Sequence, residues 1–190
     1  MTLDHLKKAA AFEAALKDLL EVMGEDPNRE GLKMTPHRVR KALLEMTAGY
    51  KVNPADLVVT FADDNDEMVL VKDVPFSSLC EHHLLPFGGL VTVGYVPDGR
   101  VVGLSKIPRI VQAVSARLQL QERLTKEVAD CLFTHSGLKP RGAAVLVRAA
   151  HSCMCVRGAR SGGQMVTSHL TGVFRTDPAC RAEFMALANG

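Results

Sequence analysis

The sequence predicts an α+β fold in which antiparallel strands surround an inserted pair of helices. Three observations lead to this prediction. Apolar residues recur three and four positions apart near the N-terminus, which is typical of amphipathic helices. Apolar and polar residues alternate in later segments, as in strands, and two further helical patterns interrupt them. No stretch has the composition of a linker between two domains.

The composition is that of a globular protein with a sizeable core. The chain has 190 residues, of which 47% are hydrophobic and 23% are charged, and this size suits one core with an appended helical piece. The net charge of +2 is too balanced to indicate nucleic acid as a partner, and the chain has no Trp and only 2 Tyr for base stacking. We expect an N-terminal helical region at residues 1–50 and a second region at residues 51–190.

The start of the chain predicts a cytoplasmic protein. Residues 1–8 are charged and contain no apolar run, so they do not resemble a signal peptide. The longest apolar stretches are too short to span a bilayer, so no membrane partner is expected. An odd number of cysteines, 5, without the spacing of a disulfide scaffold also suits a reducing compartment.

The N-terminal region is expected to contain two helices. The first covers residues 4–24 and ends at Gly24. The second covers residues 36–48, with Thr35 as its N-cap.

Strands are expected in the middle of the chain. A short strand at Val58–Phe61 is followed by strands at residues 68–76 and 89–96. Residues 97–100 read as a hairpin turn, so residues 101–104 are expected to return alongside the strand at 89–96.

The C-terminal half alternates between the two kinds of element. Helices are expected at residues 107–118 and 121–133, followed by a long strand at 143–155. A last strand at residues 165–174 and a helix at 178–188 complete the chain.

Two short motifs contain the residues best suited to bind a metal. Cys80 and His83 are three positions apart, so one turn of chain can present both to one cation. His151 and Cys153 are two apart and would share a face of the predicted strand. Three ligands from two segments with an open fourth position are typical of catalytic zinc. His82 and His151 then remain beside the metal for proton transfer.

Each motif alone has a plainer interpretation. A Cys-x-x-His spacing occurs by chance, and a buried cysteine is usually a small apolar side chain. The presence of both motifs in a chain with only 5 Cys and 7 His favours the metal site.

Several polar residues could bind a substrate. Glu122, next to Gln121, could accept two hydrogen bonds from an edge such as that of guanine, although a glutamate at a helix start also interacts with the helix dipole. The sequence contains no P-loop motif, but several basic residues could bind the phosphates of a nucleoside triphosphate. Those that follow predicted strands are Lys106 and Arg109, beside Ser105, and Arg157. Arg38 and Lys41 lie on a predicted helix. The last pair could equally belong to a solvated helix face.

Four long runs together resemble the GTP cyclohydrolase I family. They are residues 78–87 (SLCEHHLLPF), 103–111 (GLSKIPRIV), 119–125 (QLQERLT) and 151–154 (HSCM), and shorter matches at Glu25–Pro27 and Thr35–Arg38 precede them. The resemblance covers nearly the whole chain beyond the first helix.

The resemblance implies a T-fold (tunnelling fold), with residues 51–190 as the catalytic domain and the sheets of several subunits joined into barrels in a homodecamer. It implies conversion of GTP and water to formate and 7,8-dihydroneopterin triphosphate. The residues that match the family's site are zinc ligands Cys80, His83 and Cys153; catalytic His82, His151 and Ser105; and substrate-binding Glu122, Gln121, Lys106, Arg109, Arg157, Arg38 and Lys41. Cys155 is a departure, because the family commonly has an apolar residue there.

Two other functions compete with this interpretation. A different T-fold enzyme, such as a nitrile reductase, would use a cysteine nucleophile and no zinc triad. A binding protein could hold a structural zinc, which is closed by four ligands, with Cys155 or His82 as the fourth.

Overall fold

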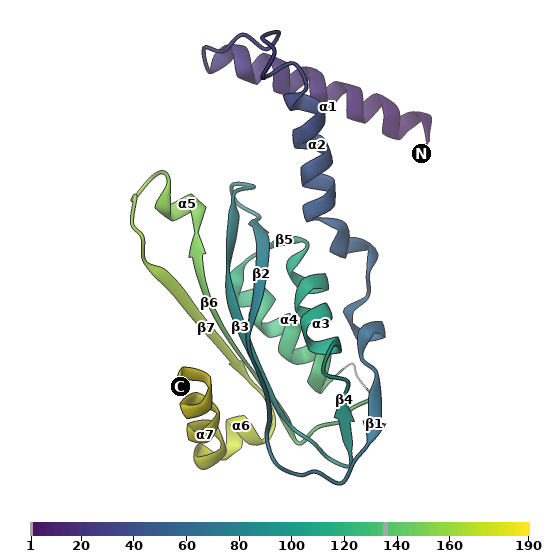
Figure 1. The fold of residues 1–190 in the computed structure, drawn as a ribbon, viewed down its shortest axis with the longest axis vertical. Helices are drawn as coiled ribbons and strands as arrows, with labels where there is room; N and C mark the ends of the chain where they lie inside the picture. Colours follow the sequence, from purple (N-terminus) through teal and green to yellow (C-terminus); the bar gives the residue numbers. More distant parts are fainter. Residues whose placement is uncertain (1, 135–136) are drawn as a thin grey trace. The chain divides into compact units, whose positions relative to one another are not determined.

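The computed structural model describes residues 2–134 and 137–190, and its chain forms two compact units, Met1–Met46 and Thr47–Gly190. Figure 1 traces the elements of each unit along the chain. Among the described residues, no helix is both long enough and apolar enough to cross a membrane.

The first unit is a pair of helices, α1 (Leu3–Val22) and α2 (Thr35–Met46). Gly24, with a φ of 88°, lies just beyond α1, in the left-handed conformation expected after a helix. Arg40 on α2 donates to the Glu13 carboxylate on α1 at 2.6 Å. Thr35 was predicted as an N-cap, but it lies within α2, where its hydroxyl donates to the Gly31 carbonyl at 3.5 Å.

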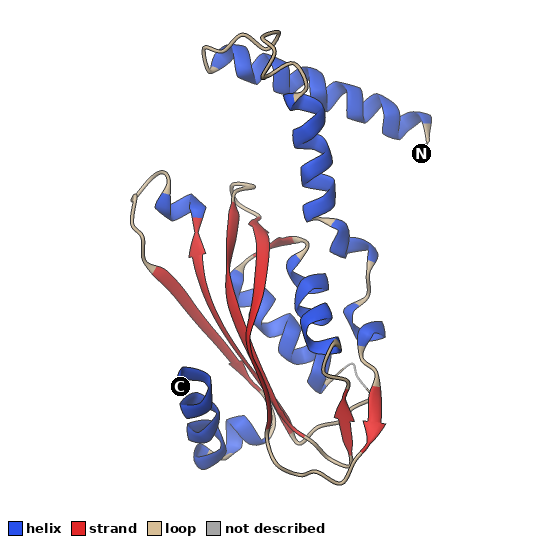
Figure 2. Cartoon of the chain, viewed as in Figure 1, coloured by secondary structure: helices blue, strands red, loops and turns tan. Residues whose placement is uncertain are grey.

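The second unit is built on a five-stranded mixed sheet in the order β5-β2-β3-β6-β7 (Figure 2). Its strands are β2 (Val69–Cys80), β3 (Pro86–Val96), β5 (Leu118–Gln119), β6 (Gly142–His151) and β7 (Gln164–Leu170). All neighbours are antiparallel except β2 and β5, which are parallel. The α+β prediction is confirmed.

Helices cover both faces of this sheet (Figure 1). Alternate residues of β6 point to opposite faces: Val145 and Val147 pack in the core that includes α3 (Lys106–Ser115) and α4 (Gln121–Phe133). Leu146 packs in a second core with Phe174 and Phe184. These two phenylalanines belong to α6 (Val173–Thr176) and α7 (Pro178–Asn189).

The predicted hairpin after residue 96 is wrong. Strand β4 (Arg100–Val102) pairs with β1 (Thr60–Ala62) in a separate two-stranded sheet, and the 3₁₀ helices η1 (Ala48–Lys51) and η2 (Pro54–Leu57) precede β1. The strand β3 cannot accept β4, because β2 and β6 already occupy both of its edges. Val102 instead donates its backbone N–H to the Tyr95 hydroxyl at 3.1 Å.

The predicted strand at residues 143–155 is too long. Strand β6 ends at His151, which pairs with Phe87 near the start of β3, so its ladder has almost no partner left beyond that point. Residues Ser152–Cys155 form one helical turn, α5, closed by a bond from Val156 N to Ser152 O at 3.0 Å. Similarly, β7 ends at Leu170 and not at 174.

The ends of two elements beside the first motif also differ from the prediction. Helix α3 ends at Ser115, and Leu118 pairs with Leu79 as part of β5. The strand predicted at residues 68–76 continues to Cys80, the last residue of β2.

Candidate metal centre and its surroundings

A tight turn at the end of β2 positions the first two candidate ligands. The Cys80 backbone donates to Leu85 O at 2.9 Å and accepts from Leu84 N at 2.8 Å, so the chain folds back at once. Leu84 has a φ of 54°, which allows this reversal. The turn brings His83 Nδ1 to 4.0 Å from the Cys80 sulfur.

The third candidate ligand, Cys153, comes from α5. The pairing of His151 with Phe87 brings the end of β6 alongside the first residues of β3, which follow the Cys80 turn. The ligand atoms of Cys80, His83 and Cys153 all lie within 4.8 Å of one another. Strand β6 and the turn therefore bring together the predicted triad.

The donor set fits a tetrahedral metal ion. Zinc bond lengths to sulfur and to imidazole nitrogen imply a separation of about 3.6 Å between two such ligand atoms. The observed 4.0 Å from Cys80 Sγ to His83 Nδ1 is close to this value. Thiolate and imidazole ligands select zinc over hard cations. Cys80 is buried whereas His83 is exposed, so the centre has an open side.

Cys155 lies outside this group, although it shares α5 with Cys153. Because the segment is a helical turn and not a strand, side chains two positions apart point in different directions. The expectation that His151 and Cys153 share one face of a strand is therefore wrong. Burial and the neighbouring Cys80 thiol raise the pKa of Cys153, and the Arg157 guanidinium acts in the opposite direction.

His151 is held on two sides. Its ring stacks on Phe87 with centroids 4.5 Å apart and planes 7° apart. Its Nε2 lies 2.8 Å from Gln121 Oε1. Burial lowers the pKa of His151, and the Glu122 carboxylate opposes this effect, which places Glu122 within electrostatic reach of the imidazole. An imidazole held in this way beside a metal centre is suited to proton transfer.

His82 lies in the turn next to the candidate ligand His83. Its side chain is exposed, and the two rings are perpendicular with centroids 6.2 Å apart. Its imidazole therefore lacks a constraint comparable to the stacking and hydrogen bond that hold His151.

The two residues that begin α4 have different environments. Glu122 is exposed in the first turn of the helix. The Gln121 side chain is buried, and its amide nitrogen lies within hydrogen-bond distance of Val147 O, Met165 O and Thr167 Oγ1. Gln121 is therefore engaged by protein groups, whereas Glu122 is open to a ligand.

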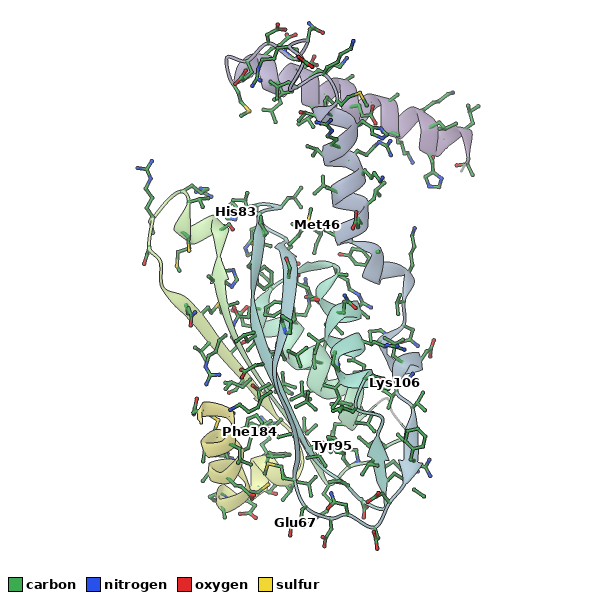
Figure 3. The ribbon with its side chains drawn as sticks, in the orientation of Figure 1. Met46, Glu67, His83, Tyr95, Lys106 and Phe184 are labelled. Carbon is green, nitrogen blue, oxygen red and sulfur yellow. The ribbon has the colours of Figure 1, made fainter. Side chains whose placement is uncertain are left out.

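The predicted phosphate-binding residues do not gather around the metal centre of one chain. Only Arg157 lies within electrostatic reach of Cys153. Ser105, Lys106 and Arg109 lie at the start of α3, which follows β4 and the Tyr95 end of β3. Helix α3 spans about 15 Å before the chain reaches Leu118, the partner of Leu79. Figure 3 shows Lys106 far from His83, toward the other end of the sheet.

A single copy of the chain therefore does not bring Ser105, Lys106 and Arg109 to its own metal centre. Arg38 and Lys41 belong to the first unit, where both are exposed on α2.

Sequence reasoning missed a network that begins beside Cys80. Arg123 donates to the Glu81 carboxylate at 2.5 Å and to Gln119 Oε1 at 2.8 Å. Gln119 Nε2 in turn donates to Glu127 at 3.1 Å. The only signal in the sequence is adjacency, because Glu81 follows Cys80 and Arg123 follows Glu122. Phe87 was missed for a similar reason, since its stacking depends on strand register.

Comparison with known proteins gives one consistent family. The family model described as GTP cyclohydrolase I matches residues 12–189. The GTP cyclohydrolase 1 of Rhodopirellula baltica is 50% identical over 182 residues, which are 95% of this chain and 79% of that protein. The GTP cyclohydrolase 1 of Synechococcus sp. is 51% identical over 93% of this chain and 78% of its own length. The Dehalococcoides mccartyi (strain BAV1) protein of the same name is 46% identical and is covered over 95% of its length.

Solved structures give weaker likenesses. The archaeosine synthase QueF-Like in its apo form matches with a TM-score of 0.44 and 20% identity, covering 55% of this chain and 93% of that chain.

Proposed function

The chain belongs to the GTP cyclohydrolase I family. We propose that its Cys80–His83–Cys153 centre binds zinc and is the site at which the imidazole ring of the GTP base is opened. Its activity is that of the family, conversion of GTP to dihydroneopterin triphosphate. The observation that supports this site best is the convergence of three ligand atoms within 4.8 Å at the same end of the sheet as His151 and Glu122. The catalytic domain of this proposal is residues 51–190.

Bound zinc supplies Lewis acidity, which lowers the pKa of water toward about 7. The protein groups supply positioning and proton transfer. The Glu122 carboxylate accepts hydrogen bonds from N1–H and the exocyclic amino group of guanine. Water adds at C8 while a histidine, His82 or His151, protonates N7, and the imidazole ring opens to a formamide. A second hydrolysis releases formate.

Later steps open the ribose, rearrange it and close the pterin ring. These steps need proton transfers near C2′, for which Ser105 and a histidine are the proposed partners. Lys106, Arg109, Arg157, Arg38 and Lys41 are the proposed cations for the triphosphate.

This assignment requires more than one copy of the chain. Ser105, Lys106 and Arg109 lie at the start of α3, about one helix length before Leu118, the partner of Leu79, yet they and Cys80 are assigned to one substrate. A second subunit that presents its α3 start to the metal centre of the first would complete the site. We therefore propose a homo-oligomer, the decamer that the family resemblance implies, with sites at subunit interfaces.

Subunit complementation tests this arrangement. Cys80→Ser removes the metal half of a site, and Lys106→Ala weakens the phosphate half. Each variant alone should be nearly inactive, whereas co-expressed chains with different tags, purified through both tags, should recover about one quarter of wild-type activity under random mixing.

The matched control combines two variants of the same half, Lys106→Ala with Arg109→Ala, and should recover nothing. If neither mixture recovers activity, the metal half and the phosphate half of each site belong to the same chain. Formate release from GTP, measured with the zinc content of the same sample, separates the enzyme from a protein that merely binds metal.

A further inference from the structure

The Gln121 side chain is completely enclosed by groups that define its orientation. It is 1% exposed. Its Nε2 lies 3.2 Å from Val147 O, 3.0 Å from Met165 O and 3.1 Å from Thr167 Oγ1. Backbone carbonyl oxygens only accept hydrogen bonds, so the amide nitrogen and not the amide oxygen must face Val147 and Met165.

This orientation decides the hydrogen position on His151. With Nε2 of Gln121 directed at the carbonyls, its Oε1 is the atom that lies 2.8 Å from His151 Nε2. An amide oxygen cannot donate, so His151 Nε2 must carry the hydrogen. Both the singly and the doubly protonated imidazole satisfy this requirement, and in both only Nδ1 can gain or lose a proton.

The neighbouring hydroxyl groups agree with this assignment. Thr125 Oγ1 lies 2.6 Å from the Gln121 backbone carbonyl and must donate to it. Thr167 Oγ1, at 2.6 Å from Thr125 Oγ1, then donates to Thr125 and keeps a lone pair for the Gln121 amide. Every donor in the chain from His151 to Thr125 therefore has an acceptor.

We propose that Gln121 is a positioning residue that holds His151 as the Nε2–H tautomer, so that Nδ1 is the nitrogen that exchanges protons with the substrate. The inference rests on the proposed function, and it replaces the guanine-binding role expected for Gln121. The Phe87 ring, stacked on His151 at 4.5 Å, restricts the plane of the imidazole. Among the described residues, Nδ1 has no hydrogen-bond partner, so its lone pair is available.

The tautomer can be read directly in the zinc-loaded, full-length protein. Solid-state NMR of protein labelled with ¹⁵N in histidine distinguishes a protonated from an unprotonated ring nitrogen. Comparison with His151→Gln, which retains an N–H donor toward Gln121, identifies the His151 signals. We expect a protonated Nε2 and an unprotonated Nδ1 at neutral pH. The opposite tautomer in the wild-type protein would overturn the proposal.

Kinetics of Gln121→Met test the functional consequence. The Met side chain has a similar length but cannot orient the imidazole, so both tautomers should appear and kcat should fall roughly 10- to 100-fold. The KM for GTP should stay within about twofold, because Gln121 contacts protein groups and not the substrate. A raised KM with an unchanged tautomer would instead show that Gln121 binds guanine.

Gln119→Met is the matched control, because Gln119 is also 1% exposed but its amide nitrogen donates to Val114 O and Glu127. This variant should keep the Nε2–H signal of His151, which separates loss of a buried amide from loss of the tautomer. If the wild-type protein releases no formate, the proposed function fails, whereas the spectrum still decides the arrangement of Gln121 and His151. If Gln121→Met does not fold, the wild-type spectrum alone decides it.

Discussion

Arg123 donates a hydrogen bond to the Glu81 carboxylate at 2.5 Å and thereby joins the residue after Cys80 to the residue after Glu122. The same guanidinium donates to Leu118 O at 2.8 Å. The turn with two candidate metal ligands and the first turn of α4 are therefore held together by a charge-assisted contact. The relative position of metal and guanine edge in the proposed reaction depends on this link.

Breaking this ion pair should loosen the metal although neither residue is a ligand. We expect Glu81→Gln and Arg123→Met each to release zinc faster to a chelator, and a double-mutant cycle on unfolding to give a coupling of about 1 kcal/mol, since both side chains are partly exposed. Glu25→Gln is the control, because it breaks an exposed pair with Arg29 in the first unit and should leave zinc release unchanged. Strictly additive effects of the two substitutions would contradict the coupling.

Zinc content should depend on Cys153 and not on Cys155. We expect Cys80→Ser and Cys153→Ser to lose the metal, because each removes one of three ligand atoms. Cys155→Val, a change in the same helical turn, should retain about one zinc per chain, measured by mass spectrometry of the metal. If Cys155→Val loses zinc and Cys153→Ser retains it, Cys155 is the ligand and Cys153 is not.

Glu122 should determine the choice of purine base. Glu122→Gln replaces one carboxylate oxygen, a hydrogen-bond acceptor, by an amide group that presents a donor to the N–H groups of guanine. The value of kcat/KM for GTP should therefore fall by a factor that corresponds to a loss of roughly 2–4 kcal/mol in transition-state binding. Inosine triphosphate lacks the exocyclic amino group, so the wild-type enzyme should prefer GTP and the variant should lose much of that preference. Asp130→Asn, on the same helix but paired with Lys126, is the control. An unchanged kcat/KM for GTP would make Glu122 only a residue at a helix start.

Stability should fall at high pH because of Cys131. Burial raises the pKa of this thiol from 9.0 to about 11. Between these values the unfolded chain has lost a proton that the native protein keeps, so the free energy of unfolding decreases as pH rises. The loss should be on the order of 2 kcal/mol, from 1.36 kcal/mol per pKa unit.

Urea unfolding of wild type and Cys131→Ala between about pH 8 and pH 11 measures this contribution, since all other groups cancel in the difference. The advantage of the wild-type protein should shrink with rising pH. A difference that does not change with pH would show that the buried thiol ionises as easily in the folded as in the unfolded protein.

The local patterns that were predicted correctly are those that depend on neighbours in the sequence. The helix at residues 121–133 is observed with those bounds, because its apolar stripe faces one core. The predicted metal triad is also brought together, since Cys80 and His83 need only one turn and Cys153 follows directly from a strand. Such features are set by spacing along the chain.

The errors arose where two distant segments compete for one partner. Strand β4 pairs with β1 because both edges of β3 are occupied. Nothing in the sequence of residues 97–104 indicates this. The pairing of β6 with β3 ends at His151, opposite Phe87, and Ser152–Cys155 form a helical turn beyond it. Nothing in the sequence of residues 143–155 indicates where this pairing ends. Strand pairing is decided by hydrogen-bonding partners far away in sequence, so local periodicity cannot locate its end.

The sequence by itself determined which residues have the chemistry for this protein: the thiols and imidazoles of the triad, the acid Glu122 and the family to which they belong. Only the tertiary structure decided how these groups face one another. It showed that Gln121 turns its amide oxygen to His151 and that Lys106 lies far from His83, toward the other end of the sheet. Residue types and spacings follow from covalent order, whereas hydrogen-bond direction and separation depend on strand register and packing across the sheet.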